Sequence, residues 1–172
     1  DVSSCALYVE KNGTTNYFST GCNIKVPFCK DTLQPNCDCA VINIDEHDMV
    51  ELSDKMSTMT SLQLVTIKNG PLAKLPPNLK ELARIRRFNF EHNRLRSFDI
   101  DVCSLSELLV IILGFNRIKT VHKCLWKHES VRFLSLSSNV GLEIPSQKDS
   151  IYLPKLQYIH VGNNSVLIPP TM

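Results

Sequence analysis

The fold is decided by the stretch Leu105-Ser-Glu-Leu108-Leu-Val-Ile111-Ile-Leu113-Gly-Phe-Asn116-Arg-Ile118. Its apolar residues are spaced three, three, two and five positions apart, and Asn116 stands between the last two. This spacing fits neither an α-helix, which repeats every 3.6 residues, nor a plain strand, which alternates every two. It indicates a short strand containing Ile111 and Leu113, followed by a tight inward turn.

The same spacing recurs along most of the chain. The asparagine returns upstream at Asn93 and downstream at Asn139 and Asn164, so that the repeat period is nearly constant. Two further upstream copies at the same interval have Gly70 and His47 in that position. The paired strand residues of these five copies are Ile42 and Ile44, Val65 and Ile67, Phe88 and Phe90, Leu134 and Leu136, and Ile159 and Val161. A near-constant period predicts a stack of similar coils.

The pattern L-x-x-L-x-L-x-x-N-x-L resembles the leucine-rich repeat family, and the resemblance covers roughly residues 37 to 168. It implies a curved α/β solenoid of about six turns, with a parallel sheet on the concave side and irregular or short-helical convex arcs. It also implies a cysteine-containing N-terminal cap of the secreted or cell-surface type. We expect this cap in residues 1–38 and the repeats in residues 39–172.

The recurring asparagine has a structural role in this interpretation. Its amide can donate and accept hydrogen bonds to the backbone of neighbouring turns. Stacked copies should therefore form an internal ladder, which comprises Asn93, Asn116, Asn139 and Asn164. We expect the ladder to be incomplete at His47 and Gly70, with Asn69 or water substituting.

Length, charge and the longest apolar run indicate neither a nucleic-acid-binding protein nor a membrane-spanning segment. The chain has 172 residues and a formal net charge of +2, without a block of like charges. This pattern does not indicate a nucleic-acid partner. The longest apolar run, from Leu108 to Phe115, is too short to span a bilayer. Because the chain begins with Asp1, we expect a processed or trimmed N-terminus.

Seven cysteines are many for a cytosolic chain of this size, and five of them fall between Cys5 and Cys39. This clustering favours a disulfide-bonded cap in an oxidising compartment over free buried thiols. Metal binding there is less favoured, because the spacing lacks paired C-x2-C clamps. Our preferred pairs are Cys5–Cys22 and Cys29–Cys37, with Cys39 unpaired, although the spacing departs from the common cap pattern. Cys103 and Cys124 form either a disulfide or two buried thiols.

Other local signals concern the cap, glycosylation and one outer arc. Ala6–Val9 and Asn16–Phe18 are expected to form a hairpin around the turn dipeptide Asn12-Gly13. Asn12 and Asn163 begin N-x-S/T sequons and are candidate glycosylation sites. The segment Leu75-Pro-Pro-Asn-Leu79 is expected to be extended.

Residues that flank the inward pair of each strand should point outward from the sheet. The first turn carries acidic residues in these positions, while Arg86 and Arg87 bring positive charge to the third. Turns four to six carry an apolar and aromatic zone instead, which favours partner binding over packing against a flanking domain or a copy of the same chain. The candidate binding residues are Arg87, Glu91, His92, Val110, Ile112, Phe115, Phe133, Tyr158 and His160.

An enzymatic function is not indicated. No cysteine falls among the outward-pointing positions beside His92 and His160, so no Cys–His pair is predicted there. The paired carboxylates Asp99 and Asp101 are expected to be solvated. No phosphate loop or dinucleotide motif is present, and no cofactor is expected.

The sequence therefore predicts a non-enzymatic extracellular module that binds a protein or peptide on its concave face. The resemblance makes a receptor-like, immune or adhesive role plausible. The last repeat lacks a cap, which would expose Leu156, Ile159 and Val161. We therefore expect either a fragment of a longer array or a C-terminal edge that pairs with something. The alternatives are self-association through the apolar zone and this edge, a glycan or lipid binder, and a cytosolic scaffold.

Overall fold

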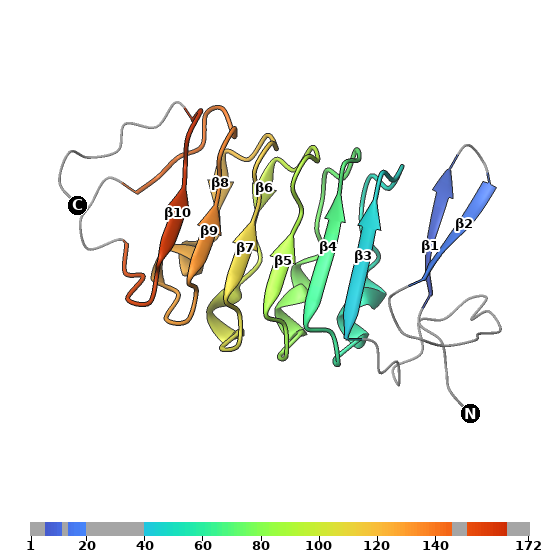
Figure 1. Cartoon of the computed structure of the whole chain (residues 1–172), viewed down its shortest axis with the longest axis horizontal. Coiled ribbons are helices and arrows are strands. Elements are labelled where there is room, and N and C mark those ends of the chain that lie inside the picture. The colour runs from blue at the N-terminus through green and yellow to red at the C-terminus, as the bar shows by residue number, and fades with distance from the viewer. Residues whose placement is uncertain (1–5, 12–13, 20–39, 146–150, 165–172) are drawn as a thin grey trace.

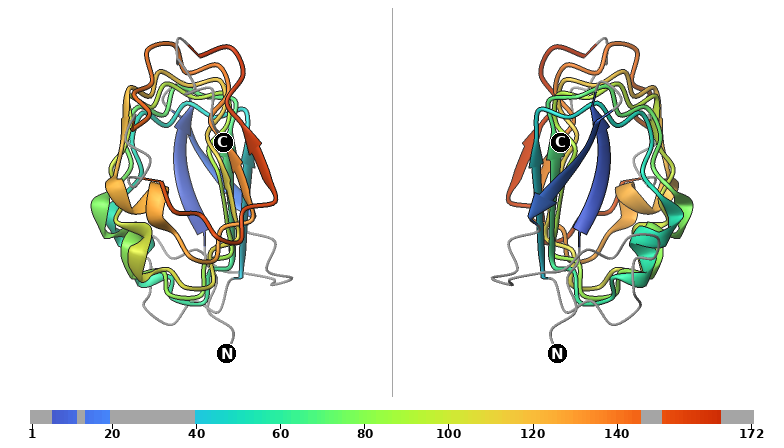
Figure 2. Two further views of the ribbon diagram at one scale, coloured as in Figure 1. Left: turned by 90° about the vertical axis from the view of Figure 1, so that its left-hand side faces the viewer. Right: turned by 90° about the vertical axis from the view of Figure 1, so that its right-hand side faces the viewer.

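The computed structural model describes residues 6–11, 14–19, 40–145 and 151–164. Residues 40–145 and 151–164 form a stack of coils, each with a strand on one side and a short helical or extended arc on the other (Figures 1 and 2). The strands are joined side by side in one parallel sheet in the order β10-β9-β7-β5-β4-β3. They are β3 (Val41–Asp45), β4 (Leu64–Lys68), β5 (Arg87–Asn89), β7 (Val110–Ile112), β9 (Phe133–Ser135) and β10 (Tyr158–His160).

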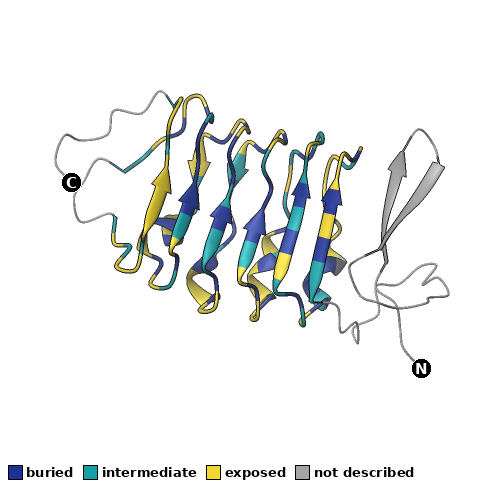
Figure 3. Ribbon diagram, in the orientation of Figure 1, coloured by how far each residue is buried: buried dark blue, intermediate teal, exposed yellow. Residues whose placement is uncertain are grey.

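The repeat period sets the register of this sheet. Each strand residue from β3 to β9 lies opposite its equivalent in the next repeat, as Val41 lies opposite Leu64, and Phe133 lies opposite Tyr158 across the longer last repeat. Equivalent side chains therefore stack in rows. The row of Ile42, Val65, Phe88, Ile111 and Leu134 is fully buried. Buried and exposed residues alternate along β3 (Figure 3), which confirms the predicted inward positions.

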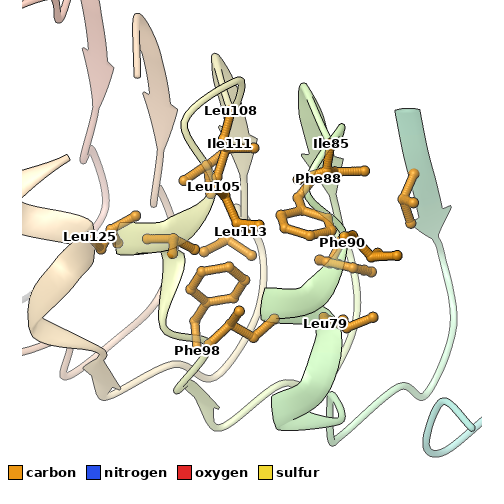
Figure 4. Packing of buried hydrophobic residues seen from close by; sticks show 14 of the residues in the cluster. Leu79, Ile85, Phe88, Phe90, Phe98, Leu105, Leu108, Ile111, Leu113 and Leu125 are labelled. Carbon is orange, nitrogen blue, oxygen red and sulfur yellow. The ribbon is translucent and has the colours of Figure 1, made fainter. Parts of the chain in front are cut away.

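Phenylalanine fills the middle of the core, where the strands face the opposite arcs (Figure 4). Phe88, Phe90 and Phe98 are fully buried, and the ring centroids of Phe88 and Phe90 are 5.6 Å apart. Phe98 comes from the outer arc and meets Phe88 edge-on at 6.4 Å. The core is therefore closed between the two sides of each coil, without contribution from the outward face of the sheet.

The outer arcs carry 3-10 helices, as the prediction of short helical turns allowed. They are η1 (Asp54–Thr58), η2 (Pro77–Glu81), η3 (Val102–Ser104) and η4 (Lys123–Lys127). The extended segment predicted at Pro76 and Pro77 is half correct. Pro76 is extended, but Pro77 begins η2, because proline already has the backbone angle of a first helical turn. A second parallel pair, β6 (Ser97–Phe98) with β8 (Thr120–Val121), was not predicted.

The N-terminal hairpin is confirmed. Strands β1 (Ala6–Lys11) and β2 (Thr14–Ser19) pair antiparallel, with Lys11 opposite Thr14. Asn12 and the five N-terminal cysteines, Cys5, Cys22, Cys29, Cys37 and Cys39, lie outside the described residues. The disulfides of the cap and the glycan at Asn12 therefore stay predictions.

The asparagine ladder joins each coil to the one before it. Asn116 donates from Nδ2 to the carbonyls of Leu113 and Gly114 in its own coil and of Phe90 in the preceding coil. Its Oδ1 accepts from the amide of Leu95, at 3.0 Å. Asn93 and Asn139 make the equivalent bonds. Each ladder residue thus satisfies backbone groups of two coils at once.

The last bond of the ladder is altered by the longer period. Asn164 donates to the carbonyl of Leu136 in the preceding coil, at 2.9 Å. Its Oδ1 accepts from the amide of Asn139, whereas the other ladder asparagines accept from an amide two positions further along. The longer last repeat therefore changes which amide is bound, but the coils stay joined.

His47 replaces the missing asparagine at position 70, and the predicted role of Asn69 is wrong. The His47 ring fills the space beside Gly70, where a Cβ would lie 2.5 Å from His47 Nε2. His47 Nδ1 accepts from the amide of Met49, as an asparagine oxygen does in later coils. Asn69 instead donates to Asp45 Oδ1, at 2.6 Å. Burial lowers the pKa of His47, which keeps the ring in its neutral, accepting form.

Strand β10 ends the described sheet. Ile159 is 36% exposed, although its counterparts in the other strands are fully buried. Leu156 and Val161 are half-buried and pack against the core cluster. Of the three residues expected to be exposed at this edge, Ile159 alone is.

We expect the substitution Asn116→Ala to lower the free energy of unfolding by roughly 3 kcal/mol. It leaves the buried amide of Leu95 without a partner and removes one of the two side-chain donors to each of the Leu113 and Phe90 carbonyls. Urea titration followed by circular dichroism measures this change. Asn43→Ala is the matched control, since Asn43 is exposed on β3, and its effect should stay within about 0.5 kcal/mol. Equal effects of the two substitutions would contradict the role of the ladder.

Candidate functional site

The outward surface of the six parallel strands and the turns that follow them is called the sheet face below. Its rows are fixed by the strand register. One row runs from Leu64 through Arg87, Val110 and Phe133 to Tyr158. Neighbouring residues of a row are about 5 Å apart, which is the spacing of strands. The structure therefore places side chains of successive coils beside one another in one continuous row.

Two aromatic stacks stand on the sheet face. The rings of Phe133 and Tyr158 are 4.9 Å apart with an angle of 7° between their planes. The rings of His92 and Phe115 are 4.2 Å apart at 8°. Tyr158 is 54% exposed and Phe115 47% exposed, so both stacks present aromatic surface to solvent. Val110 and Ile112 lie half-buried in β7, beside β9 and its Phe133.

Small polar residues occupy the surface between the stacks. Gly114, Ser135 and Ser137 are buried, and the Oγ atoms of the two serines are 3.5 Å apart. The Glu91 carboxylate lies against Gly114. A Cβ atom placed on this glycine would be 3.3 Å from Glu91 Oε1. Small side chains thus lie in the same face as the two aromatic stacks.

Charge is distributed unevenly over the same face. Asp45 in the first coil forms a salt bridge with Lys68 at 3.1 Å. The hydrogen bond from Asn69 lowers the pKa of Asp45, and the contact with Lys68 lowers it further. The Nε atom of Arg87 is buried and has no hydrogen-bond partner within the described ranges. Arg86 is paired instead with Glu107, at 3.2 Å. Asp45 is therefore paired within the face, whereas Arg87 keeps an unused donor.

A row of left-handed residues follows the strands. Positive φ angles between 53° and 58° occur at Glu46, Asn69, His92, Phe115, Ser138 and Asn163. Each of these residues directly precedes the ladder position of its coil. Asparagine tolerates this conformation, but a bulky side chain rarely adopts it, at a cost of about 1–2 kcal/mol. Phe115 is therefore strained where it stands.

The predicted site residues fall where the spacing placed them. Arg87, Glu91, Val110, Ile112 and Phe133 are half-buried, and His92, Phe115, Tyr158 and His160 are exposed. Asn163, the candidate glycosylation residue, is exposed at a left-handed turn position. Whether these residues bind a partner or carry a glycan stays a prediction.

Two features of the structure were not predicted from the repeat spacing. The first is the row of residues with positive φ, because residue types such as phenylalanine at 115 and serine at 138 do not favour this conformation. The second is a cluster on the opposite side of the coil, where Asp101, His122 and Cys124 place ligand atoms within 4.8 Å of one another. The matching tripeptides Asp101-Val-Cys103 and His122-Lys-Cys124 were a signal that could have revealed this cluster.

Cys103 and Cys124 form a disulfide, with their Cα atoms 5.2 Å apart. This finding decides between the two alternatives that the sequence left open. The bond links η3 to η4 and lies on the outer arcs, as the positions of the two cysteines in the repeat predicted.

Over the described part of the chain, no helix is long and apolar enough to cross a membrane.

Comparison with known proteins supports the fold. No protein-family model matches the sequence. The chain is similar to the crystal structure of the LRR ectodomain of the receptor kinase SOBIR1 from Arabidopsis thaliana, with a TM-score of 0.58 and 17% sequence identity. The similarity covers 92% of this chain and 79% of the other. At this identity it establishes a solenoid fold of the leucine-rich repeat type and nothing about the ligand.

The strain at Phe115 predicts an unusual mutational response. We expect Phe115→Asn to leave the free energy of unfolding unchanged or raise it by up to about 1 kcal/mol, because asparagine tolerates the left-handed conformation found at Asn69 and Asn163. Phe133→Asn is the control, because Phe133 lies in a strand with extended backbone. This substitution should lower the free energy of unfolding by roughly 1–2 kcal/mol. Thermal denaturation of both variants checks this, and equal destabilisation would refute the strain.

Proposed function

We propose that the chain is a non-enzymatic extracellular recognition module that binds a protein or peptide through the sheet face. The observation that supports this most is the pair of exposed aromatic stacks, Phe133 with Tyr158 and His92 with Phe115. Aromatic residues are enriched among those that dominate binding energy at interfaces. The coil closes its core without them, so stability alone does not require their presence.

The strain at Phe115 adds to this argument. Strained residues persist where the surrounding structure enforces them, and they concentrate at functional sites. A residue compatible with positive φ occupies the equivalent position in two other coils, Asn69 and Asn163. An exposed phenylalanine at such a position is explained better by a bound partner than by folding. The receptor ectodomain found among solved structures supports a receptor-like role through its fold.

The extracellular part of the proposal is supported by the cysteines. The Cys103–Cys124 disulfide and the cluster of five N-terminal cysteines favour an oxidising compartment over a cytosolic scaffold. The sequons at Asn12 and Asn163 agree with this location. An immune or adhesive role is a finer proposal that rests on the family resemblance alone.

Self-association is the second candidate, and the exposed Ile159 on the edge strand β10 favours it. An open strand edge offers unpaired backbone groups to another chain. Sedimentation at high concentration separates the two candidates, since a monomer would eliminate self-association. A glycan binder is less supported, because few carboxylates accompany the aromatic residues at the outward positions of the strands.

The decisive experiment is affinity capture from secreted and cell-surface fractions, followed by titration of the captured partner. The double variant Phe115→Asn with Tyr158→Ser removes one ring from each stack and leaves the core intact. We expect it to weaken binding by about thirtyfold, which corresponds to about 2 kcal/mol.

The extracellular location is tested separately. Thiol titration of the oxidised chain should show one free cysteine.

The matched control is Val140→Ser with Tyr152→Ser, which removes exposed apolar surface away from the sheet (exposed fractions 72% and 61%). This control should bind as the natural chain does. Loss of binding in the control, with binding kept in the sheet-face variant, would place the site elsewhere. Six or seven free thiols would contradict the extracellular location.

A further inference from the structure

A group of metal-ligating side chains lies on the outer arcs, away from the sheet face. Asp101, His122 and Cys124 have ligand atoms within 4.8 Å of one another, and His122 Nδ1 is 3.9 Å from Asp101 Oδ1. The disulfide joins Cys103 to the same group. Two sulfurs, an imidazole and a carboxylate are thus gathered at one place.

The backbone holds these four side chains by the same local structure in two successive coils. Asp101 precedes η3, and its Oδ1 accepts from the amide of Cys103 at 3.1 Å. His122 precedes η4, and its Nδ1 accepts from the amide of Cys124 at 3.3 Å. Each cysteine follows its capping residue by two positions, and Cys124 follows Cys103 by 21. The cluster is therefore organised by the repeat itself.

The disulfide is open to attack from one side. Cys103 is exposed and Cys124 is buried, at 7% exposure. A surface hollow of about 450 Å³ borders both cysteines and is also lined by Lys123, Trp126 and Lys127. A small dithiol fits this volume, and the two lysines favour the thiolate that forms when the bond opens.

We propose that Asp101, Cys103, His122 and Cys124 form a redox-controlled binding site for a zinc-type divalent cation. In the oxidised chain the two sulfurs are bonded to each other and bind no metal. A dithiol reduces the bond by supplying two electrons and two protons, and is itself oxidised to a disulfide. The metal then displaces one proton from each thiol and binds two thiolates, the His122 imidazole and the Asp101 carboxylate.

The ligand types and distances fit this cation class. Zinc in proteins binds four ligands tetrahedrally, at about 2.3 Å for sulfur and about 2.0–2.2 Å for nitrogen and oxygen. Ligand atoms around such an ion lie roughly 3.3–3.8 Å apart, which follows from these bond lengths. The separation of 3.9 Å between His122 and Asp101 needs little adjustment. Metal binding through His122 Nδ1 would replace its hydrogen bond from the Cys124 amide.

The disulfide of the oxidised chain and the metal of the reduced chain would have the same structural effect. The disulfide links η3 to η4 in the oxidised chain, and the metal would link the same two arcs in the reduced chain. A reducing compartment would otherwise remove this link and the stability that it gives to the closed loop. The proposal does not depend on the function assigned to the sheet face.

The test uses the whole chain, reduced with a phosphine under anaerobic conditions, and Co²⁺ as a spectroscopic probe for tetrahedral thiolate coordination. His122→Ala and Asp101→Asn keep all seven cysteines, so cobalt held by the N-terminal cysteines is unaffected. We expect each substitution to weaken the cobalt affinity of this site by about tenfold or more. Cys103→Ser with Cys124→Ser should abolish one equivalent of bound cobalt.

Asp99→Asn serves as the control outside the cluster and should bind cobalt as the natural chain does. Unreduced His122→Ala and Asp101→Asn keep the disulfide, so their melting temperatures report whether they fold. Zinc should raise the melting temperature of the reduced natural chain and not that of reduced His122→Ala. Equal cobalt binding and equal zinc stabilisation in the natural chain and His122→Ala would overturn the proposal.

Discussion

Each coil bends inward after its strand, and the carbonyl groups at this bend are buried where no strand partner reaches them. The amide of the ladder asparagine satisfies these groups, as Asn116 does for Leu113, and it also binds the Phe90 carbonyl of the preceding coil. Unsatisfied buried carbonyls would each cost about 1–3 kcal/mol. The strand register, the buried rows and the position of the outer arcs all depend on this bend recurring at the same residue.

The spacing of apolar residues and asparagine was sufficient to predict the strands, their order and the inward-pointing side chains, because a near-constant repeat period permits one register. It was insufficient at Gly70, where the preceding coil supplies His47 in place of the asparagine. Such a substitution depends on a contact between coils and has no local signal. The β6–β8 pair was missed because two-residue strands carry no periodicity.

The sheet-face candidates were found because they are apolar at positions where a solvated strand carries polar residues. Their stacking into two pairs required the register, and the strain at Phe115 required the backbone angles. The outer-arc cluster was missed for another reason: Asp101 and His122 belong to different coils, and the stacking of the two arcs brings them beside the cysteines. The molecule thus has two chemically distinct surfaces on opposite sides of one core, aromatic on the sheet and metal-ligating on the arcs.

Native-state hydrogen exchange tests the ladder most directly. The amides of Leu72, Leu95 and Ile118 donate to the side chains of Asn93, Asn116 and Asn139 rather than to backbone carbonyls. If the ladder joins the coils, these amides will exchange through global unfolding alone, with a free energy equal to that from urea titration. Exchange at the rate of an exposed turn amide would show that the asparagines occupy their positions without holding the coils together.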